Sequence, residues 1–234
     1  MKVASSQCTA CGLCVPYCPV QAIHLTGTAA CVDQAACVEC GTCRRVGVCP
    51  TGALFQPELG WPRVLRARFS DPLLVHPGTG VWGRGTTEVK TADVSGHYLI
   101  GRVGIAIEVG RPGISASFAD VEMLTRGLAG VAEFAPHNPV AELIDVRTGA
   151  LLDGAVRGER VLSAIIEVLV AQERAIDVLR RLRSLTEGID TVVTVGLIAP
   201  CPDGYAPLLE GLAAAGFAPS PGGKVNVGLG RPLA

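Results

Sequence analysis

Cysteines carry the clearest chemistry in this sequence, because nine of its ten cysteines lie within the first 49 residues. Eight of the nine belong to two similar motifs, "CTACGLCVPYCP" at residues 8–19 and "CVECGTCRRVGVCP" at residues 37–50. Each motif places three cysteines at intervals of three and then adds a Cys-Pro pair, after a gap of three residues in the first motif and five in the second. Because thiolates bind soft metals and iron–sulfur clusters, both motifs predict metal binding in a reducing compartment.

The spacing of each triplet suits one corner of a cubane cluster. A Cys-x2-Cys-x2-Cys loop can wrap around such a cluster and bind three of its irons. The fourth iron then needs a ligand from another part of the chain. Two zinc sites are the alternative, but zinc sites usually pair two Cys-x2-Cys knuckles across a long spacer, and neither triplet matches that pattern. The spacing therefore favours iron–sulfur clusters.

Together with the repeats "CPVQAIHL" and "CPTGALFQ" and the turn "VDQAACVECGTC", the motifs resemble the two-cluster bacterial-type 2[4Fe-4S] ferredoxin domain over residues 7–55. The resemblance implies two [4Fe-4S] clusters, each completed by the Cys-Pro cysteine of the other motif. The implied ligands are Cys8, Cys11, Cys14 and Cys49 for the first cluster, and Cys37, Cys40, Cys43 and Cys18 for the second. The longer gap "RRVGV" departs from the family pattern, and we expect it to bulge without moving Cys49 far.

The function implied by this resemblance is one-electron transfer through a two-cluster relay, with no catalytic residue in the chain. Residues 1–57 hold three basic and two acidic side chains, whereas the freely diffusing ferredoxins that they resemble are commonly acidic. We therefore expect an electron-transfer subunit at a fixed position, which passes electrons to or from a partner oxidoreductase.

Composition excludes several other classes. With 20 basic and 21 acidic side chains, the chain has a formal net charge of -1, which gives no electrostatic basis for binding nucleic acid or an anionic membrane. The longest apolar runs are about ten residues, too short to span a bilayer. The first residues show no apolar leader, so we expect a cytoplasmic protein.

The elements that must position the cysteines fall into three parts. These are a ferredoxin domain at residues 1–57, an irregular Gly-, Pro- and Arg-rich segment at 58–97, and an α+β domain at 98–234. In the last part, apolar alternation predicts strands at 98–110, 140–146, 160–170, 190–200 and near 224–229. Helical apolar spacing predicts helices at 118–131, 173–188 and near 205–216.

Two successive strand–helix–strand units predict a split βαβ arrangement, a ferredoxin-like sandwich with helices on one face of a mainly antiparallel sheet. One alternative stays open, because the short apolar run at 161–170 could also extend the helix that follows it.

The segment 58–97 holds both tryptophans, Trp61 and Trp82, together with Arg63, Arg66, Arg68 and Arg84. Tryptophan and arginine are common anchors of interfaces. These residues either clamp the ferredoxin domain onto the α+β domain or dock a redox partner or catalytic subunit. The glycine spacing in "HPGTGVWGRG" matches a dinucleotide fingerprint but lacks the required strand–turn–helix context, so we predict no nucleotide site.

Two other function classes stay open. The run "GRGTTEVKTADVSGHYLIGRVGIAIEVGRPG" resembles ferredoxin-containing proteins related to 6-hydroxynicotinate reductase, which implies an enzyme that takes part directly in reducing a ring or alkene. A regulatory role would require cluster oxidation to change binding by the α+β domain. For the two remaining cysteines, Cys31 and Cys201, we expect buried packing roles.

Overall fold

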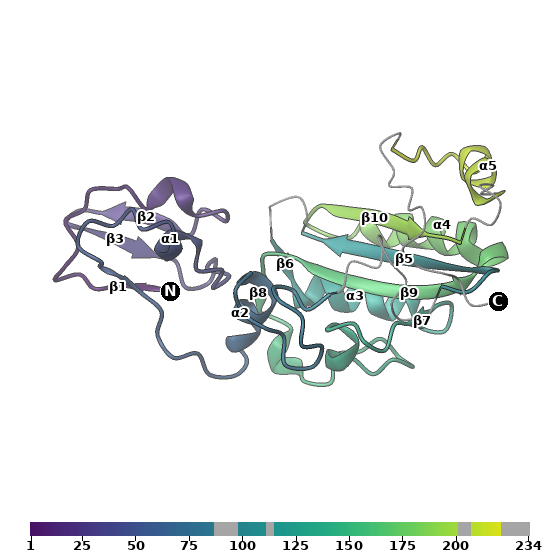
Figure 1. Ribbon diagram of the computed structural model, residues 1–234, viewed down its shortest axis with the longest axis horizontal. Helices are drawn as coiled ribbons and strands as arrows, with labels where there is room; N and C mark the ends of the chain where they lie inside the picture. The colour runs from purple at the N-terminus through teal and green to yellow at the C-terminus, as the bar shows by residue number, and fades with distance from the viewer. Residues whose placement is uncertain (87–97, 111–114, 201–206, 221–234) are drawn as a thin grey trace.

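The computed structural model describes residues 1–86, 98–110, 115–200 and 207–220. Figure 1 shows a small cysteine-rich part at the N-terminal end and a larger part around a four-stranded sheet, with helix α2 (Val64–Ser70) between them. Each part has its own buried apolar cluster. The predicted mixture of helices and strands is confirmed. Within the described residues, no helix is long and apolar enough to span a membrane.

The cysteine-rich part is built from two short antiparallel strand pairs. Strands β1 (Lys2–Val3) and β4 (Leu54–Phe55) pair with each other and so bring the two ends of this part together. Strands β2 (Ile23–Thr26) and β3 (Ala29–Val32) form the second pair. Two short helices lie at the ends of the cysteine triplets: the 3-10 helix η1 (Val15–Tyr17) follows the first triplet, and α1 (Thr42–Arg45) contains Cys43, the last cysteine of the second.

Helix α2 (Val64–Ser70) lies in the segment that we predicted to be irregular, so that prediction is wrong for these residues. Leu65 and Phe69 are four residues apart, share one face of the helix and are buried in the apolar cluster of the larger part. The ring of Phe69 packs edge-on against Phe118, with 5.3 Å between ring centroids. A helix of two turns is too short for its apolar spacing to stand out in the sequence.

The larger part is organised around one antiparallel sheet with the strand order β10–β5–β9–β7. The two central strands pair along their whole length and are buried almost throughout, because elements cover both of their faces. The strands are β5 (Arg102–Val109), β7 (Glu133–Phe134), β9 (Ala164–Ala171) and β10 (Val193–Ile198).

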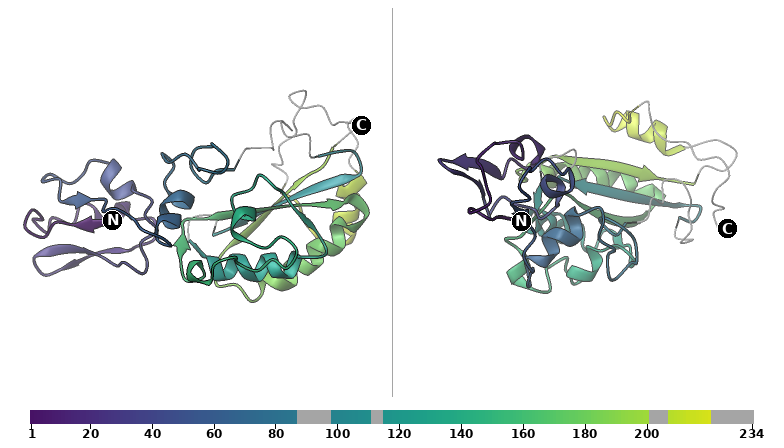
Figure 2. Two further views of the ribbon diagram at one scale, coloured as in Figure 1. Left: turned by 90° about the horizontal axis from the view of Figure 1, so that it is seen from below. Right: turned by 60° about the vertical axis from the view of Figure 1, so that its left-hand side comes forward.

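Helices α3 (Phe118–Leu128) and α4 (Ala175–Thr186) contact each other and lie together on one side of this sheet (Figure 2). Helix α3 begins with a capping box, in which the Ser117 hydroxyl accepts from the Asp120 N–H and the Asp120 carboxylate accepts from the Ser117 N–H. Helix α5 (Pro207–Ala214) follows β10 in the chain.

Two predicted strands differ from the structure. Residues 140–146 contain the 3-10 helix η2 (Ala141–Leu143), because the Asn138 side chain accepts a hydrogen bond from the Val140 N–H at 2.9 Å and starts a turn. The predicted strand 160–170 divides into β8, which pairs with β6, and β9. The predicted strand near 224–229 lies outside the described residues. The remaining short elements are β6 (Ala116–Ser117), β8 (Arg160–Val161), η3 (Gly154–Val156) and η4 (Gln172–Arg174).

Candidate iron–sulfur site

The eight motif cysteines line two cavities in the cysteine-rich part. Each cavity combines three cysteines of one motif with the Cys-Pro cysteine of the other, and their empty volumes, partly open to solvent, are about 340 and 310 Å³. The two sets of four coincide with the sets that the family resemblance implies, while their role as ligands stays a prediction. The first cavity is lined by Cys8, Cys11, Cys14 and Cys49, and the second by Cys18, Cys37, Cys40 and Cys43.

The two triplet loops share one backbone conformation. In the first loop Ala10 and Gly12 have φ of 54° and 75°, and in the second Glu39 and Gly41 have φ of 57° and 70°. A left-handed residue with a side chain costs about 1–2 kcal/mol, so its repetition at Ala10 and Glu39 indicates a shape that the loops must adopt. The shape curls each loop so that its three cysteines line one cavity.

Backbone N–H groups point at cysteine sulfurs in this part of the chain. The two Cys-Pro turns match each other, since the alanine four residues after the cysteine is the donor in both. N–H donors stabilise negative charge on a thiolate and are one of the features that tune iron–sulfur clusters. The three bonds run from Ala22 to Cys18 at 3.1 Å, from Ala53 to Cys49 at 3.3 Å and from Ala30 to Cys8 at 3.3 Å.

The five-residue gap of the second motif forms a bulge at the surface. Helix α1 ends at Arg45, and Gly47, with φ of 66°, donates its N–H to the Arg44 carbonyl at 3.2 Å. No atom lies within 4 Å of the position that a Cβ of Gly47 would occupy. Cys49 nevertheless lines the first cavity beside the first triplet. The gap thus bulges as we expected.

The ionisation of the buried thiols fits a metal cluster. Burial, together with repulsion from neighbouring thiolates, raises the pKa of the Cys43 thiol to about 11. Burial also raises the pKa of Cys14 and Cys37. In Cys49, by contrast, a hydrogen bond with the Thr51 hydroxyl lowers the pKa. Crowded thiolates in an apolar cavity require a cationic centre to offset their charge, and the irons of a cluster would provide it.

The cysteines of each set surround a hollow and do not converge on one point. Among the residues that the structure describes, no three His, Cys, Asp or Glu side chains lie close enough together to hold a single metal ion. An arrangement of this kind suits a group larger than one ion.

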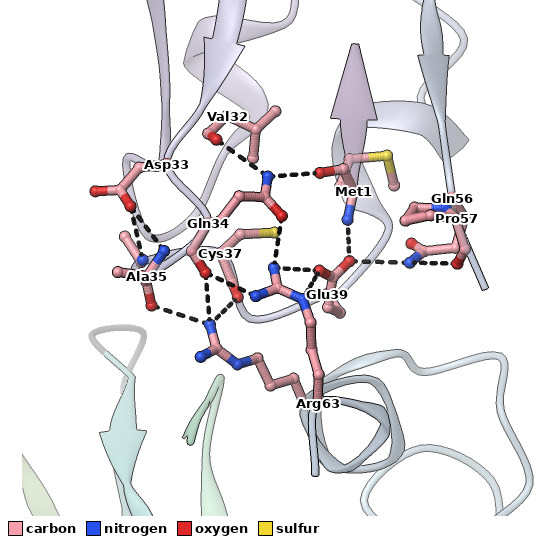
Figure 3. Close-up of polar contacts among 12 residues, drawn as sticks. Met1, Val32, Asp33, Gln34, Ala35, Cys37, Glu39, Gln56, Pro57 and Arg63 are labelled. Carbon is pink, nitrogen blue, oxygen red and sulfur yellow. Dashed lines mark hydrogen bonds and ion pairs between the residues drawn. The ribbon is translucent and has the colours of Figure 1, made fainter. Parts of the chain in front are cut away.

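Glu39, between the first two cysteines of the second motif, is a buried carboxylate held by several donors (Figure 3). Arg63 donates to its Oε1 from Nε at 2.8 Å and from Nη2 at 2.5 Å, and Gln56 donates to Oε2 at 3.0 Å. The backbone nitrogen of Met1 also contacts Oε2. Burial alone would raise the pKa of Glu39, but these donors outweigh it and the pKa lies below its ordinary value. A buried, compensated carboxylate therefore lies in the loop that carries the second triplet.

Arg66 of α2 connects the two parts of the molecule. Its buried guanidinium donates from Nη1 to the backbone carbonyls of Gln34, Ala35 and Cys37 at 3.0, 2.9 and 2.8 Å. Its Nε pairs with the carboxylate of Glu159, just before β8 in the larger part. Sequence reasoning placed Arg66 among the candidate clamp residues but not its partners, and it missed the role of Glu39. A carboxylate between two candidate ligands was a signal for Glu39, whereas the contacts of Arg66 span some thirty residues or more and leave no local pattern.

Two further contacts tie the segment after the cysteine-rich part to its neighbours. Arg45 at the end of α1 pairs with Asp71 at 2.7 Å, and the indole Nε1 of Trp61 donates to Asp153 at 2.7 Å. With the bonds of Arg63 and Arg66, these contacts are those expected of a clamp between the two parts. Trp82 remains largely exposed.

The glycine-rich loop "HPGTGVWGRG" packs against the larger part. A Cβ on Gly78 would lie 1.7 Å from a carboxylate oxygen of Glu142, so a side chain here would displace the end of the Glu142 side chain. Arg84, at the end of the loop, donates to the Ser163 hydroxyl at 2.9 Å. The close packing of the loop gives its glycines a structural role.

Of the two cysteines outside the motifs, only Cys31 lies within the described residues, so only its predicted role can be compared with the structure. Cys31 is exposed on β3, opposite His24 on β2, so the prediction of a buried packing role is wrong. Cys201 lies outside the described residues.

Comparison with known proteins bears on the first motif. A sequence model of the family described as "4Fe-4S binding domain" matches residues 1–24. The chain thus contains a 4Fe-4S binding domain at this position, which supports an iron–sulfur electron-transfer role. No curated protein and no solved structure gives a significant match to the chain.

Proposed function

We propose that this chain binds two [4Fe-4S] clusters and relays single electrons to or from a partner oxidoreductase. Each cluster takes three ligands from one motif and one ligand from the other. Cys8, Cys11, Cys14 and Cys49 hold the first cluster, and Cys18, Cys37, Cys40 and Cys43 hold the second.

One observation carries this proposal: each of the two cavities is lined by four cysteines drawn from both motifs. A cubane has four irons and needs four protein ligands. Two separate sets of four, in adjacent cavities of one small fold, match the requirement of two cubanes. The repeated left-handed loops and the matching N–H···S bonds support the same conclusion, because both halves of the site are built alike.

When bound, a [4Fe-4S] cluster accepts and releases one electron without making or breaking a covalent bond. The cysteines hold it in place, and the N–H groups of Ala22, Ala30 and Ala53 stabilise the negative charge on their sulfurs. Apolar side chains in the two linings, among them Leu54 and Ile23, limit the access of water. The buried ion pair of Glu39 with Arg63 lies in the second motif, whereas the first motif, residues 8–19, contains no charged side chain, so the two clusters have different surroundings.

We extend the proposal to the organisation of the whole chain. It comprises a ferredoxin domain at 1–57, a clamp at 58–97 and a split βαβ domain at 98–234. The chain order β5–α3–β7–β9–α4–β10 and the sheet order β10–β5–β9–β7 support the split βαβ arrangement, because each helix connects two parallel strands that flank a third. The contacts of Arg63 and Arg66 with the cysteine-rich part support the clamp.

Metal analysis of the anaerobically purified chain tests the proposal. We expect about eight irons per chain and an absorbance band at about 400 nm that dithionite bleaches. Cys49→Ser should lower the iron content by about half, whereas Cys31→Ser, a matched change at an exposed cysteine outside both cavities, should leave it unchanged. About four irons in the unaltered chain, or zinc in their place, would contradict the assignment. Bound flavin, or substrate reduction by the chain alone, would favour the direct reductase related to 6-hydroxynicotinate reductase.

A further inference from the structure

The outer end of the first cavity is exposed and apolar. Cys11, the middle cysteine of its triplet, is exposed, whereas Cys40 at the corresponding position of the second triplet is buried. Leu13 follows two residues later and is 51% exposed. Leu25 of β2 is 48% exposed, and its Cδ1 lies 3.5 Å from the position of a Cβ on Gly12. Cys11, Gly12, Leu13 and Leu25 together form what we call the Leu13 face.

The stretch of sequence that forms the Leu13 face carries no formal charge. Residues 3–32 contain no Asp, Glu, Lys or Arg, and His24 is their one basic side chain. Among the later charged side chains, Arg44 and Arg45 lie on α1, which contacts η1 (Val15–Tyr17), and Glu39 lies in the second motif. Glu39 pairs there with Arg63, and Arg45 pairs with Asp71.

The second cavity is covered on the side where the clamp lies. Arg66 of α2 donates to the Cys37 carbonyl at 2.8 Å, and a Cβ on Gly41 would lie 3.3 Å from the Asp71 carboxylate. A large partner cannot approach through these contacts without breaking them. The first cavity has an exposed cysteine at its outer end, and no hydrogen bond joins its triplet to the described clamp residues, 58–86.

We infer that the Leu13 face is the docking surface for a redox protein whose own contact surface is apolar and uncharged. This inference rests on the proposed two-cluster relay. Burying the two leucines favours association by about 25 cal/mol per Å² of apolar surface. A charged group of the partner would lose part of its hydration against this face, whose own residues supply no counter-charge. An uncharged contact surface on the partner is therefore favoured. One electron passes between the group held by Cys11 and the partner's redox centre, and no bond forms or breaks.

Two substitutions of opposite charge test whether electrons leave the protein through the Leu13 face. Leu13→Glu and Leu13→Lys each add one charge to the face, and Leu209→Glu is the matched control, because Leu209 is 53% exposed on α5 at the opposite end of the molecule (Figure 1). Stopped-flow oxidation of the reduced protein is followed with a cationic probe, hexaamminecobalt(III), and an anionic probe, tris(oxalato)cobaltate(III). We expect Leu13→Glu to raise the cation-to-anion rate ratio by about fivefold or more, and Leu13→Lys to lower it by as much.

Midpoint potentials provide an independent readout of the same variants. Leu13→Glu should lower the potential of one cluster and Leu13→Lys should raise it, while Leu209→Glu changes neither. Fewer than about eight irons, or no reducible signal in the unaltered chain, would remove the proposed relay itself. A full iron content with rate ratios and potentials that do not respond at Leu13 would overturn only the docking inference.

Photo-crosslinking tests the chemistry of the partner. A photoreactive amino acid replaces Leu13, or Leu209 as the control, in the native host. We expect a crosslinked product, formed from position 13 but not from position 209, with a protein that carries a flavin, haem or iron–sulfur centre. The Kd between that protein and the unaltered chain should change less than about threefold between about 0.1 M and about 1 M salt, because no charges are there to be screened. A strongly salt-dependent Kd, a partner without a redox centre or the absence of a Leu13-specific product would each overturn it.

Discussion

Two charged side chains near the second cavity, Glu39 and Arg66, are buried without being ligands. Glu39 forms a buried ion pair with Arg63 in the second motif, and Arg66 donates to the backbone carbonyls of Gln34, Ala35 and Cys37. Both residues therefore stabilise the surroundings of the cysteines in a way that only the folded chain shows.

Replacement of Arg66 tests this role. Arg66→Met removes this donor from the carbonyls of Ala35 and Cys37, leaves the Gln34 carbonyl with Arg63 alone, and leaves Glu159 without its cation. We therefore expect the free energy of unfolding to fall by about 3 kcal/mol or more. Arg66→Lys should recover only part of the loss, because a single compact ammonium nitrogen cannot reach both the carbonyls and the Glu159 carboxylate as the wide, planar guanidinium does. Denaturant unfolding followed by tryptophan fluorescence measures both. Arg180→Met, which removes an exposed pair with Asp177, is the control and should change stability by less than about 0.5 kcal/mol. An equal effect of the two Met variants would contradict the assigned role.

His76 makes stability depend on pH. Burial lowers the pKa of its buried imidazole, with a further lowering from Arg68 and an opposing effect from Glu142. The unfolded chain therefore binds more protons than the folded one below the ordinary pKa of about 6.5. We expect the free energy of unfolding to fall as the pH drops from about 7.5 to about 5.5, and His76→Gln to reduce that fall. Denaturant titrations at several pH values measure the difference, and parallel profiles for the two proteins would contradict it.

Among the elements, α1 and the bulge after it accommodate the longer gap of the second motif, which has two residues more than the gap of the first. The bulge depends on Gly47, whose left-handed backbone turns the chain back towards the first cavity. Nothing lies near its missing Cβ, so backbone conformation alone decides what a side chain costs there.

A pair of glycine substitutions isolates that cost. Gly47→Ala should destabilise the protein by about 1 kcal/mol, because a left-handed residue with a Cβ is strained. Gly154→Ala is the matched control: its Cβ also meets no atom within 4 Å, but its φ is not positive. The control should be neutral or slightly stabilising. Thermal unfolding of both variants at full iron content provides the comparison, and equal melting temperatures would exclude strain at Gly47.

Much of the element plan could be predicted from the sequence, because it follows from local patterns. The cysteine spacing is repeated, and the alternation from Val103 to Val109 is long enough to indicate a strand. Residues 140–146 were mistaken for a strand because Val140 and Ile144 are apolar, whereas the Asn138 side chain starts a turn there. The two groups of four cysteines that the family resemblance implies match the linings of the two cavities, while their role as ligands stays a prediction. Contacts such as Arg66 with Cys37 join distant residues, and no local pattern reveals them.

At the scale of the whole molecule, the two parts have cores of different kinds. The larger core consists of aliphatic and aromatic side chains from the sheet, α2, α3 and α4. The smaller one includes Cys14, Cys37 and Cys43 and surrounds two cavities. Few apolar side chains remain in the smaller core when the cysteines are set aside, so its stability depends on what the cavities hold.

Removal of iron tests this difference. Chelation under anaerobic conditions should expose the backbone amides of residues 1–57 to rapid hydrogen exchange, because crowded thiolates and unfilled cavities then destabilise the smaller core. Amides in β5 and β9 should keep their protection, since the larger core contains no cysteine among its buried members. Hydrogen–deuterium exchange with mass spectrometry compares the two forms. Unchanged protection in residues 1–57 after iron removal would contradict the prediction.

The exchange of Cys-Pro cysteines between the two cavities fixes an order of events during synthesis. The first triplet leaves the ribosome earlier than the second, yet its cavity lacks a wall until Cys49 has followed. The second cavity receives its remote cysteine, Cys18, early and is complete once Cys43 has emerged. The motif that is translated first is therefore the last to be closed, and a nascent chain that stops short of Cys49 exposes three unshielded thiols to oxidants and stray metals.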